Sequence, residues 1–248
     1  MLFVQDAHGD LKKQSTKEYK KGLIMMQYFH RQVQLWGEDT QKKLQTKKIA
    51  IIGAGGLGSS LSFALGATGI GEIHIIDFDA VSLHNIHRQI AFKMGDEGKN
   101  KAKINAQIIE QKCPYVKAIA HECNFEEWSK KNITVDLIID ATDNLPTRGE
   151  INTYAKKVKT PWIYGSVEAF HGQVCFFDNS SFNDAFKIVQ KTPAGIAAPI
   201  VMHIASLQAN LALRFLANLS VKKDLLYYLF FNEEGELITQ KFGLPTEG

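Results

Sequence analysis

Three closely spaced glycines form the chemical signature of this chain that is easiest to interpret. Gly53, Gly55 and Gly58 follow an apolar run in the pattern Gly-x-Gly-x-x-Gly. In such a turn the first glycine permits the tight bend, and the second lets a phosphate approach the backbone. The third lets the following helix pack close to the strand, and the start of that helix offers unpaired N–H groups to an anion. The spacing therefore predicts a phosphate-binding turn.

An acidic residue stands where the ribose of a nucleotide would need an acceptor. A second apolar run, Ile73 to Ile76, ends in Asp77, about twenty residues after the glycines. Strand, glycine turn, helix, strand and acid follow one another in the order that a nucleotide fingerprint requires. Asp77 is therefore a candidate ribose ligand, although a glycine-rich turn that binds nothing and an Asp77 that only caps a loop remain open.

Further charged residues go beyond what a dehydrogenase needs. Arg31 lies upstream of the turn, and Asp79, Arg88, Lys101 and Asp143 lie downstream. Cations of this kind suit the charge on a triphosphate and on its transition state. A carboxylate that follows a strand is well placed to hold Mg²⁺ against phosphate oxygens, and strand ends are where a doubly wound sheet binds its ligand.

Each of these charged residues also has a structural alternative. Arg31 can be a surface charge on a helix, and Arg88 and Lys101 can be ion-pair partners. Asp143 can form an Asx turn or begin a helix before Leu145. The residue types alone leave these alternatives open.

The elements that must position these residues alternate between strand and helix. We expect an α/β fold with a Rossmann-like, doubly wound, mainly parallel sheet, because nearly continuous apolar strands indicate a sheet covered on both faces. An antiparallel extension follows near the C-terminus. The predicted strands are 48–52, 72–77, 117–122, 135–139, 161–166, 173–177, 226–231 and 236–241. The predicted helices are 56–69, 99–112, 146–158 and 199–216.

The N-terminal residues and one long segment near the C-terminus do not follow the strand–helix alternation. Residues 1–17 are polar and are expected to form a disordered segment, while residues 18–248 are expected to form a single nucleotide-binding domain. Residues 18–46 read as helical, with an apolar stripe that includes Phe29 and Leu35. Residues 179–197 read as a long loop, which in a compact domain is usually functional or mobile.

Composition limits the environment and the partners that we expect. The net charge of +3 is too small to argue for DNA or RNA as a partner. The three cysteines are scattered singly, without a Cys-x-x-Cys pair, so a zinc site is not expected. Their small, odd number favours a reducing compartment. There is no uninterrupted apolar stretch long enough for a membrane span and no signal-peptide pattern. The cytoplasm is the expected location.

These motifs together resemble the ThiF/MoeB/HesA family, bacterial relatives of ubiquitin-activating enzymes. The resemblance covers roughly residues 25–245 and rests on the order and spacing of short segments. The segments are Arg31-Gln32, Gly53 to Gly58, Asp77 to Asp79, Asn85 to Gln89, Lys101, Asp140 to Asn144, and Ala197 to Pro199 leading into Ser206 to Ala209. The family binds ATP and Mg²⁺ and adenylates the C-terminal Gly-Gly carboxylate of a small ubiquitin-like protein.

The resemblance implies a role for each matching residue. The implied nucleotide-binding residues are Gly53, Gly55, Gly56, Gly58, Asp77, Asp79, Asn85, Arg88, Gln89 and Lys101. The implied catalytic residues are Arg31, Arg88, Lys101 and Asp143, with Asp143 as the Mg²⁺ ligand and Arg31 reaching into the partner's site across a homodimer interface. The activated carrier would then accept sulfur, from a sulfur donor protein, for thiamin or molybdenum-cofactor synthesis.

The chain departs from many members of this family at its cysteines. It lacks the two Cys-x-x-Cys pairs that bind structural zinc, and it has no thiol between Val189 and Pro193, where relatives carry a reactive cysteine. Cys175 lies in a predicted strand and is expected to be a buried apolar residue. We therefore expect adenylation without a covalent thiol step.

Other functions remain open at this stage. A variant of the same chemistry would activate a peptide or a tRNA base. An NAD-dependent oxidoreductase would explain the glycines and Asp77 but would leave Asn85, Arg88, Lys101 and Asp143 without a joint purpose. A non-catalytic partner subunit is the third alternative.

Overall fold

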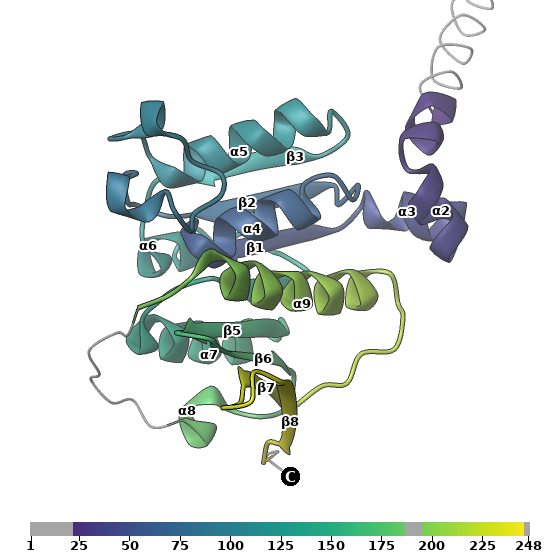
Figure 1. Ribbon diagram of the computed structural model, residues 1–248. Helices are drawn as coiled ribbons and strands as arrows, with labels where there is room; N and C mark the ends of the chain where they lie inside the picture. Colours follow the sequence, from purple (N-terminus) through teal and green to yellow (C-terminus); the bar gives the residue numbers. More distant parts are fainter. Residues whose placement is uncertain (1–21, 187–194, 246–248) are drawn as a thin grey trace, which may run out of the picture.

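An eight-stranded sheet runs through the centre of the molecule in the computed structural model, which describes residues 22–186 and 195–245 (Figure 1). The strand order is β3-β2-β1-β4-β5-β6-β7-β8, and neighbours are parallel as far as β5 and antiparallel beyond it. The parallel strands are β1 (Lys48–Ile52), β2 (Glu72–Ile76), β3 (Lys117–His121), β4 (Leu137–Asp140) and β5 (Trp162–Glu168). The antiparallel strands are β6 (His171–Phe177), β7 (Leu225–Phe231) and β8 (Leu237–Gly243). The predicted fold class is confirmed.

Burial explains why the central strands read as apolar runs. Four of the five residues of β1 and of β2 are buried, and the whole of β4 is buried. Successive residues of β1 enter opposite cores: Ile49 and Ile51 pack on one face of the sheet, and Ala50 and Ile52 on the other. A strand that is buried on both faces needs apolar residues at every position, as in other covered parallel sheets.

Helices cover both faces of the sheet (Figure 1). One face packs against α4 (Gly56–Leu65), α5 (Lys101–Lys112) and α9 (Ala198–Leu216), whose buried side chains join one core cluster. The other face packs against α6 (Phe125–Ser129), α7 (Leu145–Val158) and α8 (Phe182–Ala185). Two 3₁₀ turns, η1 (Leu83–Asn85) and η2 (Met94–Asp96), lie in the connection from β2 to α5. In the described ranges, no helix is both long and apolar enough to cross a membrane.

The N-terminal helical region is divided where the sequence predicted one stretch. Residues 22–28 are helical, and α2 (His30–Trp36) and α3 (Glu38–Leu44) follow, separated by Gly37 at φ +82°. Phe29 is 2% exposed, as the predicted apolar stripe requires, but Leu35 is 72% exposed, so the stripe is wrong at that position. Val33 and Trp36, four and seven positions after Phe29, pack against the core, whereas Leu35, six positions after Phe29, falls off that face of the helix. Residues 1–17 lie outside the described residues.

The predicted loop at 179–197 contains a short helix. Residues Phe182–Ala185 form α8, and Phe182 is buried in the core beside Trp162. An Asp224 carboxylate accepts hydrogen bonds from the backbone N–H groups of Asp178, Asn179 and Ser180, and so ties the start of this connection to β7. Residues 187–194 lie outside the described residues. The α6 helix is a further element that the periodicity did not predict.

Candidate nucleotide site

The glycine turn joins the C-terminal end of β1 to the N-terminus of α4. Gly53 has φ +98°, and a Cβ on it would lie 2.6 Å from the Ala141 carbonyl oxygen. A Cβ on Gly58 would collide with the Gly53 carbonyl oxygen, so both positions require glycine. A Cβ on Gly55 would meet only the Gln89 amide group, with its Nε2 nearest at 3.4 Å, which is ordinary contact. Packing does not therefore require glycine at residue 55, whose bare backbone suits a phosphate.

Gly56 has a different explanation. A Cβ on this residue would lie 2.9 Å from the Val201 Cγ1 on α9. The close approach of α4 and α9 therefore accounts for this glycine without a ligand, whereas the sequence analysis grouped it with the nucleotide-binding residues.

Asp77 holds the glycine turn from the end of β2. Its Oδ2 accepts a hydrogen bond from the Ala54 N–H at 2.7 Å, and its Oδ1 accepts one from the Asp79 N–H at 2.8 Å. Burial raises the pKa of Asp77, and these two N–H donors and the charge of Lys101 act against that rise. Each carboxylate oxygen keeps a second acceptor position, so Asp77 can shape the turn and still accept from a ribose hydroxyl.

Lys101 begins α5 and is brought to the same edge of the sheet. Its Nζ lies 2.8 Å from the Asp79 Oδ2, and its backbone N–H donates to the Asp79 carbonyl at 2.9 Å. The lysine side chain is 8% exposed, whereas that of Asp79 is 49% exposed. Lys101 is therefore an ion-pair partner, which is the structural alternative considered for it. The pair is connected to the glycine turn by Asp77, which accepts hydrogen bonds from both the Asp79 N–H and the Ala54 N–H.

The connection from β2 to α5 carries Asn85, Arg88 and Gln89. Asn85 and Gln89 are buried, and no described residue contacts the Gln89 Oε1 by a hydrogen bond. The Arg88 Nη1 donates to the His84 carbonyl at 3.1 Å and lies 3.0 Å from the His87 Nε2. Within the described ranges Arg88 has no carboxylate partner, so the ion-pair alternative is not found for it.

A buried network holds the end of β4, three residues before Asp143. The fully buried Asp140 accepts from the Thr142 Oγ1 at 2.6 Å and from the Arg148 Nε at 3.0 Å. The Gln208 Nε2 on α9 donates to the Asp140 carbonyl at 2.7 Å. Burial raises the pKa of Asp140, and the Arg148 guanidinium opposes this. Asp143 itself is exposed.

Sequence reasoning missed Arg148 and gave no separate role to Gln208. Arg148 also donates to the Thr142 carbonyl at 2.7 Å and to the Gly165 carbonyl at 3.1 Å, so it joins the loop to β5. The only signal in the sequence is an arginine four residues after Asn144, about one turn into the helix that follows the acidic loop, and such a residue is normally on the surface.

Arg31 does not approach this site within one chain. It is exposed on α2, and its Nη1 contacts the Gln34 Oε1 on its own helix at 3.3 Å. The neighbouring Gln32 donates to the Thr68 carbonyl at 2.8 Å, beyond the C-terminal end of α4. The glycine turn lies at the N-terminal end of α4, about 15 Å of helix away. Figure 1 shows α2 and α3 at the opposite edge of the sheet from that turn.

The model of the ThiF family matches residues 29–243. The chain belongs to the ThiF family. A molybdopterin-synthase adenylyltransferase of Haemophilus influenzae is 30% identical over 221 residues, which are 84% of this chain and 89% of that protein. A sulfur carrier protein adenylyltransferase of Thermus thermophilus is 31% identical over 159 residues, 62% of this chain and 59% of that protein.

Some curated relatives of this ThiF-family chain are much longer. The adenylyltransferase and sulfurtransferase MOCS3 of Caenorhabditis briggsae is 30% identical over 216 residues, and the match covers 81% of this chain but 53% of that protein. Among solved structures, E. coli MccB with AMPCPP and MccA has the same fold, with a TM-score of 0.75 at 21% identity, over 88% of this chain and 72% of that one.

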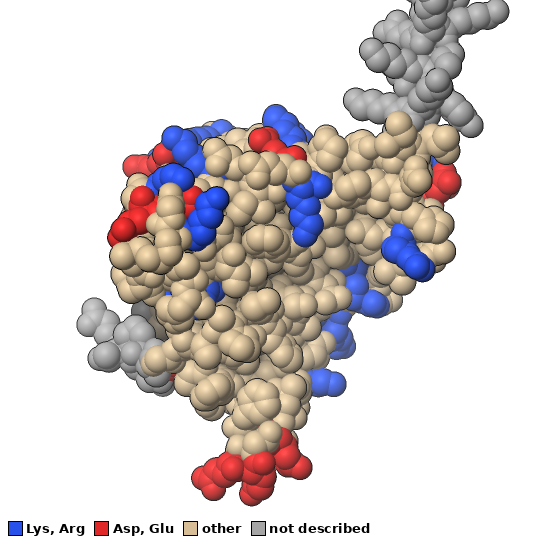
Figure 2. All heavy atoms as spheres, turned by 45° about the horizontal axis from the view of Figure 1, so that its top comes forward, with Lys and Arg blue, Asp and Glu red and all other residues tan. Residues whose placement is uncertain are grey.

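The surface over the β2–α5 connection carries charges of both signs. Figure 2 shows basic and acidic side chains mixed at the upper left of the face in view, with a broad area of uncharged residues below them. Lys99 pairs with Asp96 at 2.8 Å, and Lys103 pairs with Glu122 at 2.7 Å. Near the candidate site, these two lysines are therefore already paired with carboxylates.

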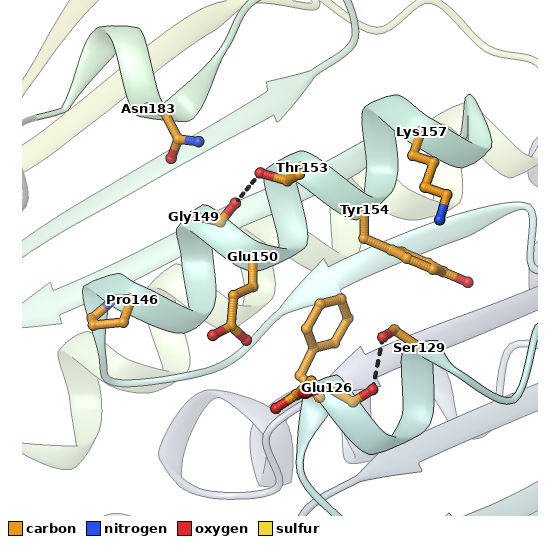
Figure 3. Close-up of a pocket in the computed structure, with 10 residues that line it drawn as sticks. Glu126, Ser129, Pro146, Gly149, Glu150, Thr153, Tyr154, Lys157 and Asn183 are labelled. Carbon is orange, nitrogen blue, oxygen red and sulfur yellow. Dashed lines mark hydrogen bonds between the residues drawn. The ribbon is translucent and has the colours of Figure 1, made fainter.

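A separate pocket of about 530 Å³ lies between α6 and α7 (Figure 3). Glu126 comes from α6, Glu150 and Tyr154 come from α7, and Asn183 lies at one end of the pocket. These helices cover the face of the sheet opposite to α4. The pocket is therefore not part of the candidate nucleotide site, which is built around the N-terminus of α4.

The three cysteines of this ThiF-family chain, Cys113, Cys123 and Cys175, are all buried. Cys175 has no exposed surface, as expected, and burial raises the pKa of its thiol. A reactive cysteine instead needs an accessible thiolate in a positive environment. The geometry therefore offers no support for a nucleophilic thiol at Cys175.

Proposed function

We propose that this chain is an ATP-dependent adenylyltransferase that activates the C-terminal glycine carboxylate of a small ubiquitin-like sulfur-carrier protein, for thiamin or molybdenum-cofactor synthesis. One observation carries the proposal. The glycine turn, the Asp77 carboxylate and the buried Lys101 meet at one edge of the parallel sheet in a ThiF-family chain. The names of the relatives in Haemophilus influenzae and Thermus thermophilus support the same reaction class.

The nucleotide would be held by backbone and by cations. Its phosphates would lie at the N-terminus of α4, where unpaired N–H groups and the helix dipole favour negative charge. Arg88 and Lys101, together with Asn85 and Gln89 beside them, would contact the phosphates, and Asp77 would bind the ribose. These roles agree with the bare backbone at Gly55 and with Arg88, whose guanidinium pairs with no carboxylate among the described residues.

The reaction needs no general base. The carrier's terminal carboxylate is already ionised near neutral pH. One of its oxygens would attack the α-phosphorus of ATP, and the bond from that phosphorus to the oxygen bridging to the β-phosphate would break. An acyl-adenylate and pyrophosphate would result. Catalysis would then consist of aligning the reactants and stabilising the charge on the phosphates, which is the task of Arg88 and Lys101.

Asp143 is the residue that we assign to Mg²⁺. Asp143 is exposed in the loop that follows β4, and the buried Asp140–Arg148 network fixes this loop. Magnesium is usually held by one or two carboxylates together with substrate phosphates, so a single exposed carboxylate fits the ion. When bound, the ion would neutralise charge on the phosphates. In the described ranges no cluster of three or more potential ligands occurs.

Arg31 would complete the site from a second copy of the chain. Within one chain it lies at the far end of α4, so it can serve the reaction only across a homodimer interface. The exposed apolar residues around it, Leu23, Ile24, Tyr28 and Leu35, support burial of this region against another protein surface.

Two measurements test the proposal. Purified protein should bind ATP with Mg²⁺ far more tightly than NAD, which separates an adenylyltransferase from an oxidoreductase. Incubation with ATP and a carrier that ends in Gly-Gly should yield the carrier adenylate, detected by intact-mass spectrometry, and a carrier with its last glycine removed should not. Tight binding of NAD without adenylate formation would overturn the proposal, and nucleotide binding without any chemistry would indicate a non-catalytic subunit.

A further inference from the structure

A buried amide on α5 contacts the backbone of the glycine turn. Asn105 has no exposed surface, and its Nδ2 donates to the Ala54 carbonyl and to the Lys101 carbonyl, both at 3.1 Å. Both partners are carbonyl oxygens, so the NH₂ group must face them. Ala54 lies inside the glycine turn, fifty-one positions away in the chain. Asn105 therefore links the turn directly to the first turn of the helix that carries Lys101.

The apolar surroundings of Asn105 indicate that packing alone does not explain an amide at this position. Its neighbours on the buried side of α5, Ala102, Ala106 and Ile109, belong to an apolar core cluster. A buried amide in such surroundings costs free energy unless its groups are hydrogen-bonded. Its Oδ1 has no hydrogen-bond partner among the described residues, so only the NH₂ group repays that cost. An apolar residue would fill the space without this cost, but it could not hold the Ala54 carbonyl.

The contact with Asn105 also fixes the direction of the Gly55 N–H, because the Ala54–Gly55 peptide is planar. In a trans peptide the C=O of one residue and the N–H of the next point in opposite directions. Asn105 fixes the Ala54 C=O toward α5, so the Gly55 N–H must point away from α5. The Gly55 carbonyl accepts the Ser59 N–H at 2.8 Å and begins α4, while the Gly55 N–H has no acceptor among the described residues.

The preceding peptide is fixed from another element. The Ala54 N–H donates to the Asp77 Oδ2 at 2.7 Å, at the end of β2. Asp77 in turn binds the Asp79 N–H, and Asp79 binds the Lys101 Nζ. The two sides of Ala54 are therefore held by a closed ring of contacts that passes through Asp77, Asp79, Lys101 and Asn105.

We propose that Asn105 is a positioning residue for nucleotide binding, which orients the Ala54–Gly55 peptide so that the Gly55 N–H donates to a phosphate of ATP. This rests on the proposed function of the site. Asn105 touches neither substrate nor reacting atoms in this scheme. It acts through the backbone of the turn, and through the Lys101 carbonyl, which accepts a hydrogen bond from the same NH₂ group.

The test compares Asn105→Leu with a matched control. Asn105→Leu keeps a similar volume but removes the amide, so it is expected to raise the dissociation constant and the KM for ATP roughly tenfold, which is the usual effect of losing a hydrogen bond to a charged group. The KM for the carrier should be unchanged. Asn152→Leu is the control, because Asn152 is an equally buried amide on α7, bound to Ser181 and Phe182 on the other face of the sheet. It should lower the Tm without changing ATP affinity.

The outcomes separate this inference from the proposed function. If the wild-type protein does not bind ATP, in titration calorimetry with Mg²⁺ present, the proposed function fails and this inference with it. If the wild type binds ATP and Asn105→Leu binds it equally well, or raises both KM values alike, only this inference is overturned. Should Asn105→Leu not fold, ¹⁵N-glycine labelling of the wild type decides. The Gly55 amide resonance, assigned with Gly55→Ala, must shift when ATP is added, and an unchanged resonance overturns the inference.

Discussion

Lys101 and Asp79 are joined twice, once by their side chains at 2.8 Å and once by the Lys101 N–H and the Asp79 carbonyl at 2.9 Å. The double contact fixes the start of α5 to the segment that follows β2. The lysine is buried and the aspartate is half-exposed, so the ammonium group can exchange this partner for a phosphate at the open side of the site. A charge held in place before the ligand arrives needs little reorganisation during the reaction.

Lys101→Met should therefore reduce the rate of pyrophosphate exchange by roughly 10²- to 10³-fold, because the transition state loses a preorganised charge. The protein should stay folded, since Asp79 can be solvated. The matched control is Lys103→Met, because Lys103 lies two residues further on α5, with 58% exposure and a pair to Glu122. Equal activity of the two variants would show that Lys101 serves only the fold.

The sequence predicted the parts of the site that depend on neighbours in the chain. The glycine turn, the helix after it and Asp77 were found because a strand, a turn and a second strand leave a local periodic pattern. Asn105 and Gln208 were not assigned roles, because their partners Ala54 and Asp140 lie 51 and 68 positions away in the chain. An amide in a helix carries no local sign of such a distant partner.

The proposed role of Arg31 in the partner's site of a homodimer gives a second test. Arg31→Ala and Arg88→Ala should each be inactive on their own. When the two variants are mixed and allowed to exchange subunits, some mixed dimers contain one site with both arginines, so part of the activity should return. Activity is measured by carrier adenylate formation, together with sedimentation to establish the oligomeric state. A protein that is monomeric and active at assay concentrations would rule out the role of Arg31 in a partner's site.

A histidine pair across β2 and β3 predicts how stability depends on pH. The His74 Nδ1 lies 2.8 Å from the His121 Nε2. Burial, with the nearby His74 and Lys131, lowers the pKa of His121 from 6.5 to about 4, and burial also lowers the pKa of His74. Between pH 6.5 and about pH 4 the unfolded chain binds more protons at His121 than the folded chain does. The contribution of this histidine to the free energy of unfolding is therefore complete above pH 6.5 and is lost as the pH falls toward 4.

The check is the urea midpoint of unfolding at pH 7.5 and pH 5. His121→Gln should narrow the difference between the two midpoints, because one of the groups that bind protons on unfolding is gone. His203→Gln, on the exposed face of α9, should leave the difference as in the wild type. The same difference between the two urea midpoints in all three proteins would show that the histidine pair does not control the loss of stability at low pH.

The buried cysteines should be dispensable for adenylation. Replacing Cys113, Cys123 and Cys175 together by Ala should leave carrier adenylate formation intact, with a loss of stability of roughly 1 kcal/mol for each truncated side chain. Intact-mass spectrometry after incubation with ATP and carrier follows both the adenylate and any covalent adduct. A carrier-sized adduct that thiol reductant removes, and that a single cysteine variant abolishes, would mean that a thiol takes part.

ATP–pyrophosphate exchange with wild type and Asp143→Ala tests the adenylation account most directly. The account predicts exchange that requires Mg²⁺ and a carrier ending in Gly-Gly, and that Asp143→Ala abolishes without lowering the Tm. Asp39→Ala is the matched control, since Asp39 is an exposed acid on α3 whose ion pair, among the described residues, is a surface contact to Lys42 at 3.9 Å. The control should exchange like the wild type. Exchange at the same rate in Asp143→Ala, or exchange without any carrier, would contradict the account.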